Sequence, residues 1–134
     1  MKKPERDYSH RSLFDKLGVF AEAHVAIAGS HDAAFTAALD AILAKAASRA
    51  VRGRYDLIFL KLDMPRDLSK ISNAAAHLQP AGALWVFHPK GRGAAPSDGE
   101  VRAAGLAAGL VDNKISAYTD SHTATRFVIP IARR

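Results

Sequence analysis

The chain has no cysteine, few aromatic residues and no long apolar run, and each absence excludes a class of protein. Without cysteine among its 134 residues, it forms no disulfide, no thiolate metal site and no cysteine nucleophile. No apolar run approaches the roughly 20 residues that a membrane-spanning helix needs. The charged residues 1–7 lead into no apolar segment, so the sequence predicts no secretory signal and a cytoplasmic protein.

Acidic residues are fewer than basic ones, which favours an anionic partner. The 13 Asp and Glu against 19 Lys and Arg leave a net charge of +6 at pH 7. Such a balance is typical of proteins that meet nucleic acid or phosphate-bearing ligands, or simply of a solvated basic surface. Aromatic residues make up 7% of the chain and do not alternate with the basic ones. The sequence therefore disfavours nucleic-acid binding. Much of the basic excess lies at Lys2, Lys3, Arg49, Arg52, Arg54, Lys90, Arg92, Arg133 and Arg134.

What the chain does contain is an alternation of apolar runs and amphipathic segments. The apolar runs predict strands at 25–29, 55–60, 83–87, 111–118 and 124–132. Apolar residues at helical spacing predict helices at 13–17, 33–47, 65–78 and 97–109. Gly18 would end the first helix, Ser30 or Asp32 would cap the second, and Ser97 with Glu100 forms a capping box for the last.

This element order predicts a single α/β domain over residues 1–134, with residues 1–20 as a lead-in and a short helix. The first three strands are expected to be parallel, with helices covering the sheet in a three-layer, Rossmann-like arrangement. The last two strands, separated only by residues 119–123, are expected to form an antiparallel hairpin. The sequence thus predicts a mostly parallel sheet of about five strands.

The segment from Leu78 to Lys90 is predicted to contain the end of a helix, a turn at Pro80-Ala-Gly82 and a buried strand with Trp85, which ends before Pro89. It resembles the fifth-strand region of the class I S-adenosylmethionine-dependent methyltransferases. By this resemblance residues 25–29, 55–60 and 83–87 correspond to the first, fourth and fifth strands of that family. The hairpin corresponds to its closing pair. The chain thus resembles a class I methyltransferase that lacks strands two and three.

A closer resemblance is to a small bacterial family of uncharacterised proteins with a truncated methyltransferase-like fold. Three places carry it: Tyr8-Ser9 leading to Lys16-Leu17-Gly18, then residues 82–86 followed by Pro89-Lys90, and the phrase at 104–114. This resemblance implies a fold and leaves the activity open.

The residues at the expected cofactor site argue against S-adenosylmethionine. The methyltransferases need a glycine-rich turn after the first strand, and this chain has only Gly29 there. They also need an acidic residue that binds the ribose hydroxyls, but residues 47–55 are basic and contain no carboxylate. Without strands two and three the first strand would be an edge, which needs cover from residues 8–18 or from a second subunit. The sequence therefore predicts no cofactor and a homodimer.

Polar residues that follow the predicted parallel strands mark a candidate ligand crevice. His31, Asp63 and His88 each follow one of these strands, and imidazole and carboxylate groups serve as metal ligands or general bases. The alternative is that they are ordinary loop residues and that Ser30 or Asp32 is a helix cap. Adjacent residues such as Ser30-His31-Asp32 or Ser121-His122 do not by themselves supply a catalytic triad. We therefore assign no catalytic or metal-binding residue, and the candidate crevice comprises Gly29, Ser30, His31, Asp63, His88 and Lys90.

Three functional hypotheses remain open, and none of them involves a membrane. The first is a non-catalytic or degenerate methyltransferase-like domain that acts through binding or oligomerisation, which leans against an enzyme. The second is a minimal S-adenosylmethionine-dependent methyltransferase on an unidentified small substrate. The third is an anionic-ligand or nucleic-acid binder that uses the charges at 49–54 and 133–134, whose binding would weaken steeply with salt.

Overall fold

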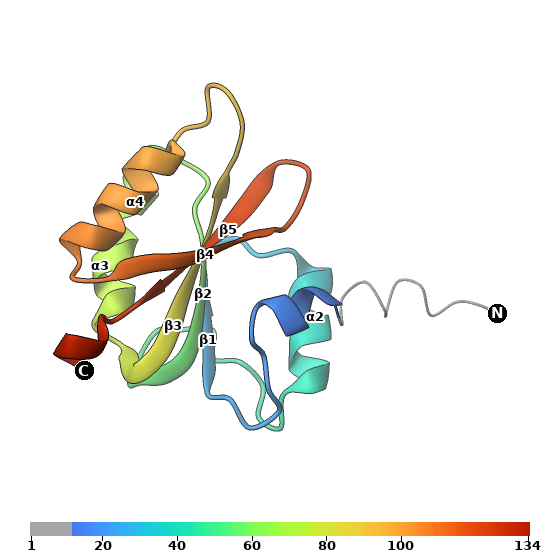
Figure 1. Ribbon diagram of the computed structural model, residues 1–134. Helices are drawn as coiled ribbons and strands as arrows, with labels where there is room; N and C mark the ends of the chain where they lie inside the picture. Colours follow the sequence, from blue (N-terminus) through green and yellow to red (C-terminus); the bar gives the residue numbers. More distant parts are fainter. Residues whose placement is uncertain (1–11) are drawn as a thin grey trace.

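A mixed sheet of five strands forms the centre of the protein in the computed structural model, which describes residues 12–134 (Figure 1). Its strand order is β1-β2-β3-β5-β4. The strands β1, β2 and β3 are parallel, and β5 is antiparallel to both β3 and β4. The predicted fold class is therefore confirmed. The bounds are β1 (Val25–Ala28), β2 (Tyr55–Lys61), β3 (Leu78–Pro89), β4 (Val111–Ala117) and β5 (His122–Val128).

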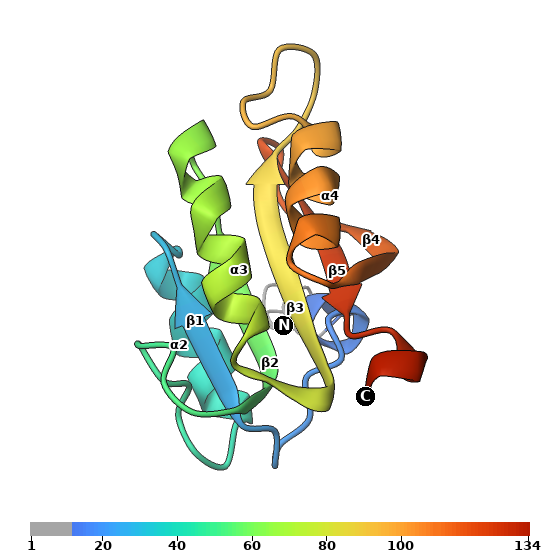
Figure 2. The same cartoon turned by 90° about the vertical axis from the view of Figure 1, so that its left-hand side faces the viewer.

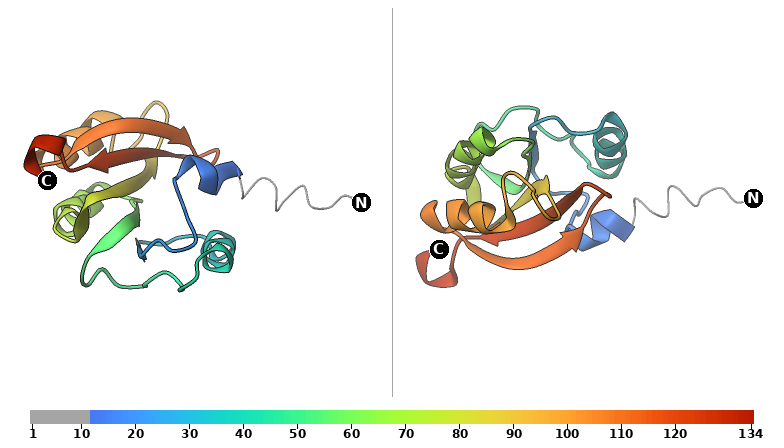
Figure 3. Two further views of the ribbon diagram at one scale, coloured as in Figure 1. Left: turned by 60° about the horizontal axis from the view of Figure 1, so that its bottom comes forward. Right: turned by 90° about the horizontal axis from the view of Figure 1, so that it is seen from above.

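Helices cover both faces of the sheet and make two separate hydrophobic cores. The helix α2 (Ala33–Ile42) and a short helix at residues 12–16 lie on one face, and α3 (Lys70–Ala75) and α4 (Asp98–Ala107) lie on the other (Figures 1 and 2). Side chains alternate along β3, so Trp85 and Phe87 face α2 whereas Leu84 and Val86 face α3 and α4. Seen from above, the helices lie on either side of the sheet (Figure 3).

Trp85 is a core residue, as predicted, and it also holds the N-terminal turn in place. Its side chain is fully buried, and its Nε1 donates a hydrogen bond to the carbonyl oxygen of Leu17 at 2.9 Å. The predicted end of the first helix is also confirmed, because Gly18 has φ +76° and its amide donates to the backbone carbonyl oxygen of Asp15. The phrase Tyr8-Ser9 lies outside the described residues.

The outer edge of β1 is covered by the chain itself, which corrects the prediction of cover from residues 8–18 or a second subunit. Ser48 forms a parallel bridge with Ala26 there. Its amide donates to the carbonyl of Val25 at 2.8 Å, and its carbonyl accepts from Ile27 at 2.9 Å.

The helix α2 ends at Ile42, five residues earlier than predicted, because the chain must turn back to reach β1. Leu43 adopts an extended conformation and is buried. The Asp40 carboxylate accepts hydrogen bonds from the amide of Ala47 at 2.9 Å and from Arg49 at 2.7 Å. These bonds hold the reversal. Asp32 occupies the N-cap position of α2, as predicted, but its side chain makes no capping hydrogen bond.

The predicted helix at 65–78 is divided, and the strand after it is longer than predicted. A 3₁₀ helix, η1 (Pro65–Ser69), precedes α3, and β3 already begins at Leu78, which pairs with Tyr55. The expected turn at Pro80-Ala-Gly82 is an irregular part of this strand, where the register with β2 shifts. A Cβ at Gly82 would lie 2.8 Å from the carbonyl oxygen of Tyr55, so the two strands approach closely there.

The C-terminal elements agree with prediction in type and pairing. Ser97 Oγ accepts from the amide of Glu100 at 3.2 Å, and Glu100 Oε1 accepts from the amide of Ser97 at 2.9 Å, which confirms the capping box. The hairpin of β4 and β5 is antiparallel. A second 3₁₀ turn, η2 (Ile131–Arg133), follows Pro130, so the strand ends earlier than predicted. No helix within residues 12–134 combines the length and apolar character needed to cross a membrane.

Candidate functional site

A polar cleft of about 290 Å³ lies at the carboxyl edge of the parallel strands. Three segments meet there: the loop after β1, the end of β2 and the turn between β4 and β5. This is the edge of an open α/β sheet at which ligands bind. All of its lining residues have polar side chains, which carry hydroxyl, carboxylate, amine or imidazole groups. They are Ser30, Asp32, Lys61, Tyr118, Thr119, Ser121 and His122.

Gly29 brings the loop after β1 close to β2. It has φ +91°, and a Cβ there would collide with the carbonyl oxygen of Lys61. Only glycine combines this left-handed conformation with so close an approach between backbones. Gly29 thereby sets Ser30 at the rim of the cleft, beside Lys61.

Asp63 is the centre of a polar group that the tertiary structure assembles from β2 and the hairpin. Lys61 Nζ lies 3.0 Å and His122 Nε2 lies 3.4 Å from Asp63 Oδ1. The other ring nitrogen, His122 Nδ1, lies 2.8 Å from Ser121 Oγ. A serine, a histidine and an aspartate thus lie in series, which the adjacency of Ser121 and His122 in the sequence does not predict.

This series differs from the geometry of a serine hydrolase. In that geometry the serine contacts Nε2 and the aspartate contacts Nδ1, whereas here the two ring nitrogens have exchanged partners. What the arrangement can do is to hold a proton acceptor, His122, between a carboxylate and the cleft.

His31 lies beside the cleft but turns inward. Its Nε2 lies 2.8 Å from the carbonyl oxygen of Phe59, and its ring stacks on Phe35 and meets Phe87 edge-on. A carbonyl oxygen only accepts, so Nε2 carries the hydrogen and the buried Nδ1 is left as an acceptor with no partner among the described residues. Burial lowers the pKa of His31, with backbone hydrogen bonds as opposing influences. Burial thus favours the neutral form of this ring.

His88 lies on the opposite face of the sheet, so the structure does not gather His31, Asp63 and His88 into one site. Its side chain is buried on the α4 side, with Nε2 at 2.8 Å from Thr125 Oγ1 and Nδ1 at 3.5 Å from Asp98 Oδ1. It lines a separate crevice of about 130 Å³ between α4 and the hairpin. Burial lowers the pKa of His88 as well, and the nearby Asp98 carboxylate opposes this.

The remaining candidate from the sequence, Lys90, does not line the polar cleft. Lys90 is exposed, and its backbone amide donates to the carbonyl of Ser121 at 3.1 Å, so it fixes the hairpin turn. Across residues 12–134 no three His, Asp or Glu side chains come together in a way that would hold a metal ion.

Sequence reasoning missed the contributions of Lys61, Tyr118, Thr119 and His122. Pairing of Pro89 with His122 brings the hairpin turn to the carboxyl edge, and no local pattern in the sequence announces this register. Burial, together with the negative charge of Asp32, raises the pKa of Tyr118 to about 12. Its hydroxyl therefore remains protonated and is available as a donor near neutral pH.

Comparison with known proteins identifies the architecture. No protein-family model matches the chain. No curated protein matches it in sequence. Among solved structures, magnesium protoporphyrin IX methyltransferase (ChlM) from Synechocystis PCC 6803 with bound S-adenosylmethionine (SAM) superposes with a TM-score of 0.66 at 12% identity. The alignment covers 92% of this chain and 77% of that one.

The same enzyme with bound SAH gives a TM-score of 0.68 at 11% identity, over 92% of this chain and 81% of that one. The ribosomal protein L11 methylase from Lactobacillus delbrueckii subsp. bulgaricus gives 0.57 at 12% identity, over 90% and 77% of the two chains. The fold is that of the class I methyltransferases. In this methyltransferase-like domain, Ser48 pairs with β1 on the side where the full fold continues with further strands.

Proposed function

We propose that the protein is a small-molecule-binding domain of methyltransferase-like fold whose cleft at the carboxyl edge takes a small zwitterion. The observation that carries this proposal is the opposite charge of Asp32 and Lys61 within one cleft. An amino-acid-type ligand carries an ammonium group that suits the carboxylate of Asp32. Its carboxylate suits the amine of Lys61.

The partners of the two charged side chains support this assignment. The Asp32 carboxylate has no ion pair or hydrogen bond with any other residue that the structure describes. Lys61 is held toward the rim by its ion pair with Asp63. Ser30, Tyr118 and Thr119 also line the cleft, and their hydroxyl groups can satisfy the remaining polar atoms of a ligand.

The outer side of β1 argues against a complete SAM molecule in the usual position. There the backbone of Ser48 occupies the hydrogen-bonding edge of the strand. No carboxylate occurs in residues 47–55, whereas an acidic residue near this point normally binds the ribose hydroxyls. The nucleoside part of SAM would therefore lack its acidic partner, whereas the zwitterion site that we propose uses only the carboxylate of Asp32 and the amine of Lys61.

A calorimetric comparison of two carboxylate variants tests the proposal. Free amino acids, starting with L-methionine, are titrated into the wild type, into Asp32→Asn and into the control Glu22→Gln, which removes an exposed carboxylate outside the cleft. We expect saturable binding by the wild type and by E22Q, and binding at least about tenfold weaker by D32N because a charge-assisted hydrogen bond is lost. Equal affinities for D32N and E22Q, or no binding by the wild type, would overturn the proposal.

A second candidate function is a minimal methyltransferase, and the structures of ChlM with SAM and with SAH favour it. The cofactor would supply a methyl group when bound. In this chain, His122 beside Asp63 would accept the proton that a substrate hydroxyl or amine releases. Titration of SAM and of SAH distinguishes the candidates: micromolar affinity for either supports the methyltransferase. The absence of heat and of a thermal shift with both excludes it.

A further inference from the structure

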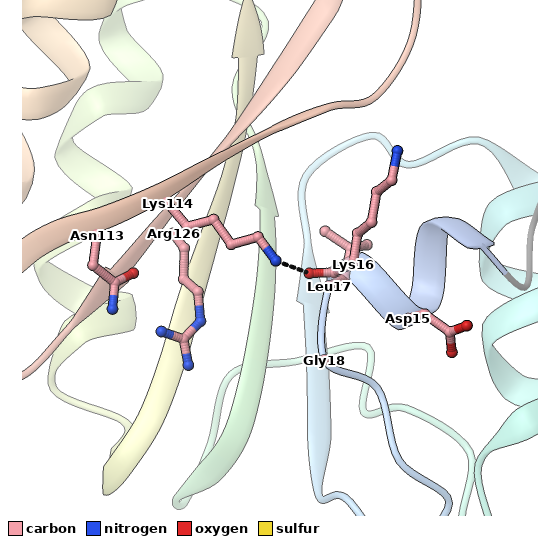
Figure 4. A pocket seen from close by; sticks show the side chains of 7 residues that line it. All are labelled: Asp15, Lys16, Leu17, Gly18, Asn113, Lys114 and Arg126. Atoms are coloured by element: carbon pink, nitrogen blue, oxygen red, sulfur yellow. Dashed lines mark hydrogen bonds between the residues drawn. The ribbon is translucent and has the colours of Figure 1, made fainter.

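A second concave site lies on the α2 side of the sheet, between the N-terminal turn and the hairpin (Figure 4). Its volume is about 350 Å³, and its walls are residues 15–18 of the turn together with Asn113, Lys114 and Arg126. None of the residues that line the polar cleft at the carboxyl edge lines this site. It therefore needs an explanation of its own.

Two cations face each other directly across the hairpin in this site. Lys114 of β4 is the register partner of Arg126 of β5. Like charges in directly opposed positions of an antiparallel pair destabilise the sheet. The pairing is therefore unfavourable unless an anion lies between or beside the two groups.

A β-bulge brings a third polar group to the same place. The register of β4 with β5 shifts between Asp112 and Lys114, which inserts Asn113 as an extra residue. Figure 4 shows the amide of Asn113 and the guanidinium of Arg126 pointing to the same side, whereas the Asp15 carboxylate points away from them. The one acidic side chain in the wall thus does not neutralise Arg126.

The Arg126 side chain is half-buried and makes no hydrogen bond or ion pair with any other residue from 12 to 134. Burial lowers the pKa of Arg126, and the charge of the nearby Arg134 lowers it further. A partly desolvated guanidinium with its donors unused is unfavourable without an acceptor.

The opposite wall of the site is anchored to the sheet. Lys114 Nζ donates a hydrogen bond to the carbonyl oxygen of Lys16 at 3.1 Å, and the next carbonyl, of Leu17, accepts from Trp85 at 2.9 Å. These bonds fix the turn 15–18 at two successive residues. The site is consequently preformed, which reduces the entropy that a ligand must lose on binding.

We propose that this site binds the phosphate group of a small molecule. The planar guanidinium of Arg126 presents paired N–H donors that match two phosphate oxygens, while Lys114 contributes a point charge and Asn113 an amide donor. A doubly charged phosphate neutralises both members of the opposed Lys114–Arg126 pair, which a single carboxylate does not. The charge and the donor geometry of the site thus both favour phosphate.

A matched pair of arginine variants tests this proposal. Arg126→Met removes the central cation, and Arg92→Met removes an exposed arginine from the loop after β3, with the same change in net charge. Inorganic phosphate is titrated at constant ionic strength and followed by thermal shift and by backbone amide NMR. We expect R92M to bind like the wild type, and R126M to bind at least about tenfold more weakly because a charge-assisted contact is lost. The amide shifts should centre on residues 16–18 and 113–114.

A second readout keeps the test valid if R126M is altered in stability. Without phosphate, R126M should unfold at a higher temperature than the wild type, because the opposed like charges are gone. Equal phosphate affinity in R126M and R92M, or amide shifts confined to other regions, would overturn the proposal.

Two further measurements identify the source of the phosphate group and test whether the two sites are independent. Co-sedimentation with vesicles containing phosphatidic acid, without a saturable response to inorganic phosphate, would contradict the small-molecule assignment. The variant Asp32→Asn should retain phosphate binding in full. The zwitterion proposal and the phosphate proposal can therefore fail independently of each other.

Discussion

Gly29 is the residue at which backbone geometry and the candidate site are most directly linked. It combines a positive φ with an approach to the Lys61 carbonyl that leaves no room for a Cβ. Gly91 also has a positive φ, of +96°, but a Cβ there would meet nothing within 4 Å. Alanine at Gly91 would therefore be disfavoured only by the positive φ, whereas alanine at Gly29 would also be disfavoured by the collision with Lys61.

We predict that Gly91→Ala destabilises the protein by about 1–2 kcal/mol through the left-handed conformation alone. Gly29→Ala should destabilise it by clearly more, because the loop must also move away from β2. Urea unfolding of both variants measures the difference. If the two losses are equal, the close contact with Lys61 is relaxed in solution.

The buried histidines predict how stability changes with pH. Burial lowers the pKa values of His31 and His88 in the folded state, whereas an unfolded histidine titrates near 6.5. Below that pH the unfolded chain binds more protons than the folded one, so stability falls as the pH falls. Lys61 and Asp63 face His31, and Asp98 and His122 face His88, so both shifts include opposing charges.

We therefore expect the free energy of unfolding to decrease between pH 7.5 and 5.5. Each pKa unit of separation contributes up to about 1.4 kcal/mol. The double variant His31→Gln/His88→Gln should flatten this dependence, and His24→Gln, at an exposed position, should not. Urea unfolding at the two pH values checks the prediction, and an unchanged slope in the double variant would refute it.

At the scale of the element, α4 shows how packing overrides helix propensity. The helix contains two glycines, which intrinsic propensity disfavours. At Gly105 a Cβ would collide with the ring of Phe127, whereas at Gly99 it would meet nothing within 4 Å. Gly105 thus allows α4 to lie close against β5.

Alanine substitutions at these two positions should have opposite effects. Gly99→Ala should stabilise the protein by up to about 1 kcal/mol through helix propensity. Gly105→Ala should destabilise it by about 1–3 kcal/mol, because the helix is pushed away from the sheet. Thermal unfolding of both variants compares the effects. A stabilising G105A would mean that Phe127 rotates freely to make room.

At the scale of the whole molecule, the two edges of the five-stranded sheet bear on how the protein can associate. The sequence predicts a homodimer because the first strand would be an unpaired edge. Ser48 pairs with that edge, so an unpaired first strand is no longer a reason to expect a dimer. In the other edge strand, β4, Ile115 is 70% exposed.

The homodimer stays a prediction, and β4 is the edge through which we expect it to form. Sedimentation velocity should then show a dimer for the wild type and a monomer for Ile115→Lys, since an edge lysine opposes strand pairing. The exposed control Ile131→Lys lies in η2, outside the sheet, and should behave like the wild type. A wild type that is monomeric at all concentrations would count against association.

Local patterns in the sequence determined most of the elements. Apolar runs located all five strands, Ser97 and Glu100 located the start of α4, and Trp85 was recognised as core, because these features depend on neighbours along the chain. Errors arose at element ends. The prediction ended the third strand at Phe87, and since β3 continues to Pro89, His88 turns to the face opposite Phe87.

Only the tertiary structure decided which side chains share a site. The register of β3 with β5 brings His122 to Asp63, and the register of β4 with β5 opposes Lys114 to Arg126. The return of the chain after α2 places Ser48 on β1. These contacts join residues far apart in sequence, so no local periodicity encodes them. The amino-acid sequence by itself therefore determined the class of fold, while strand register and chain reversal decided both candidate binding sites.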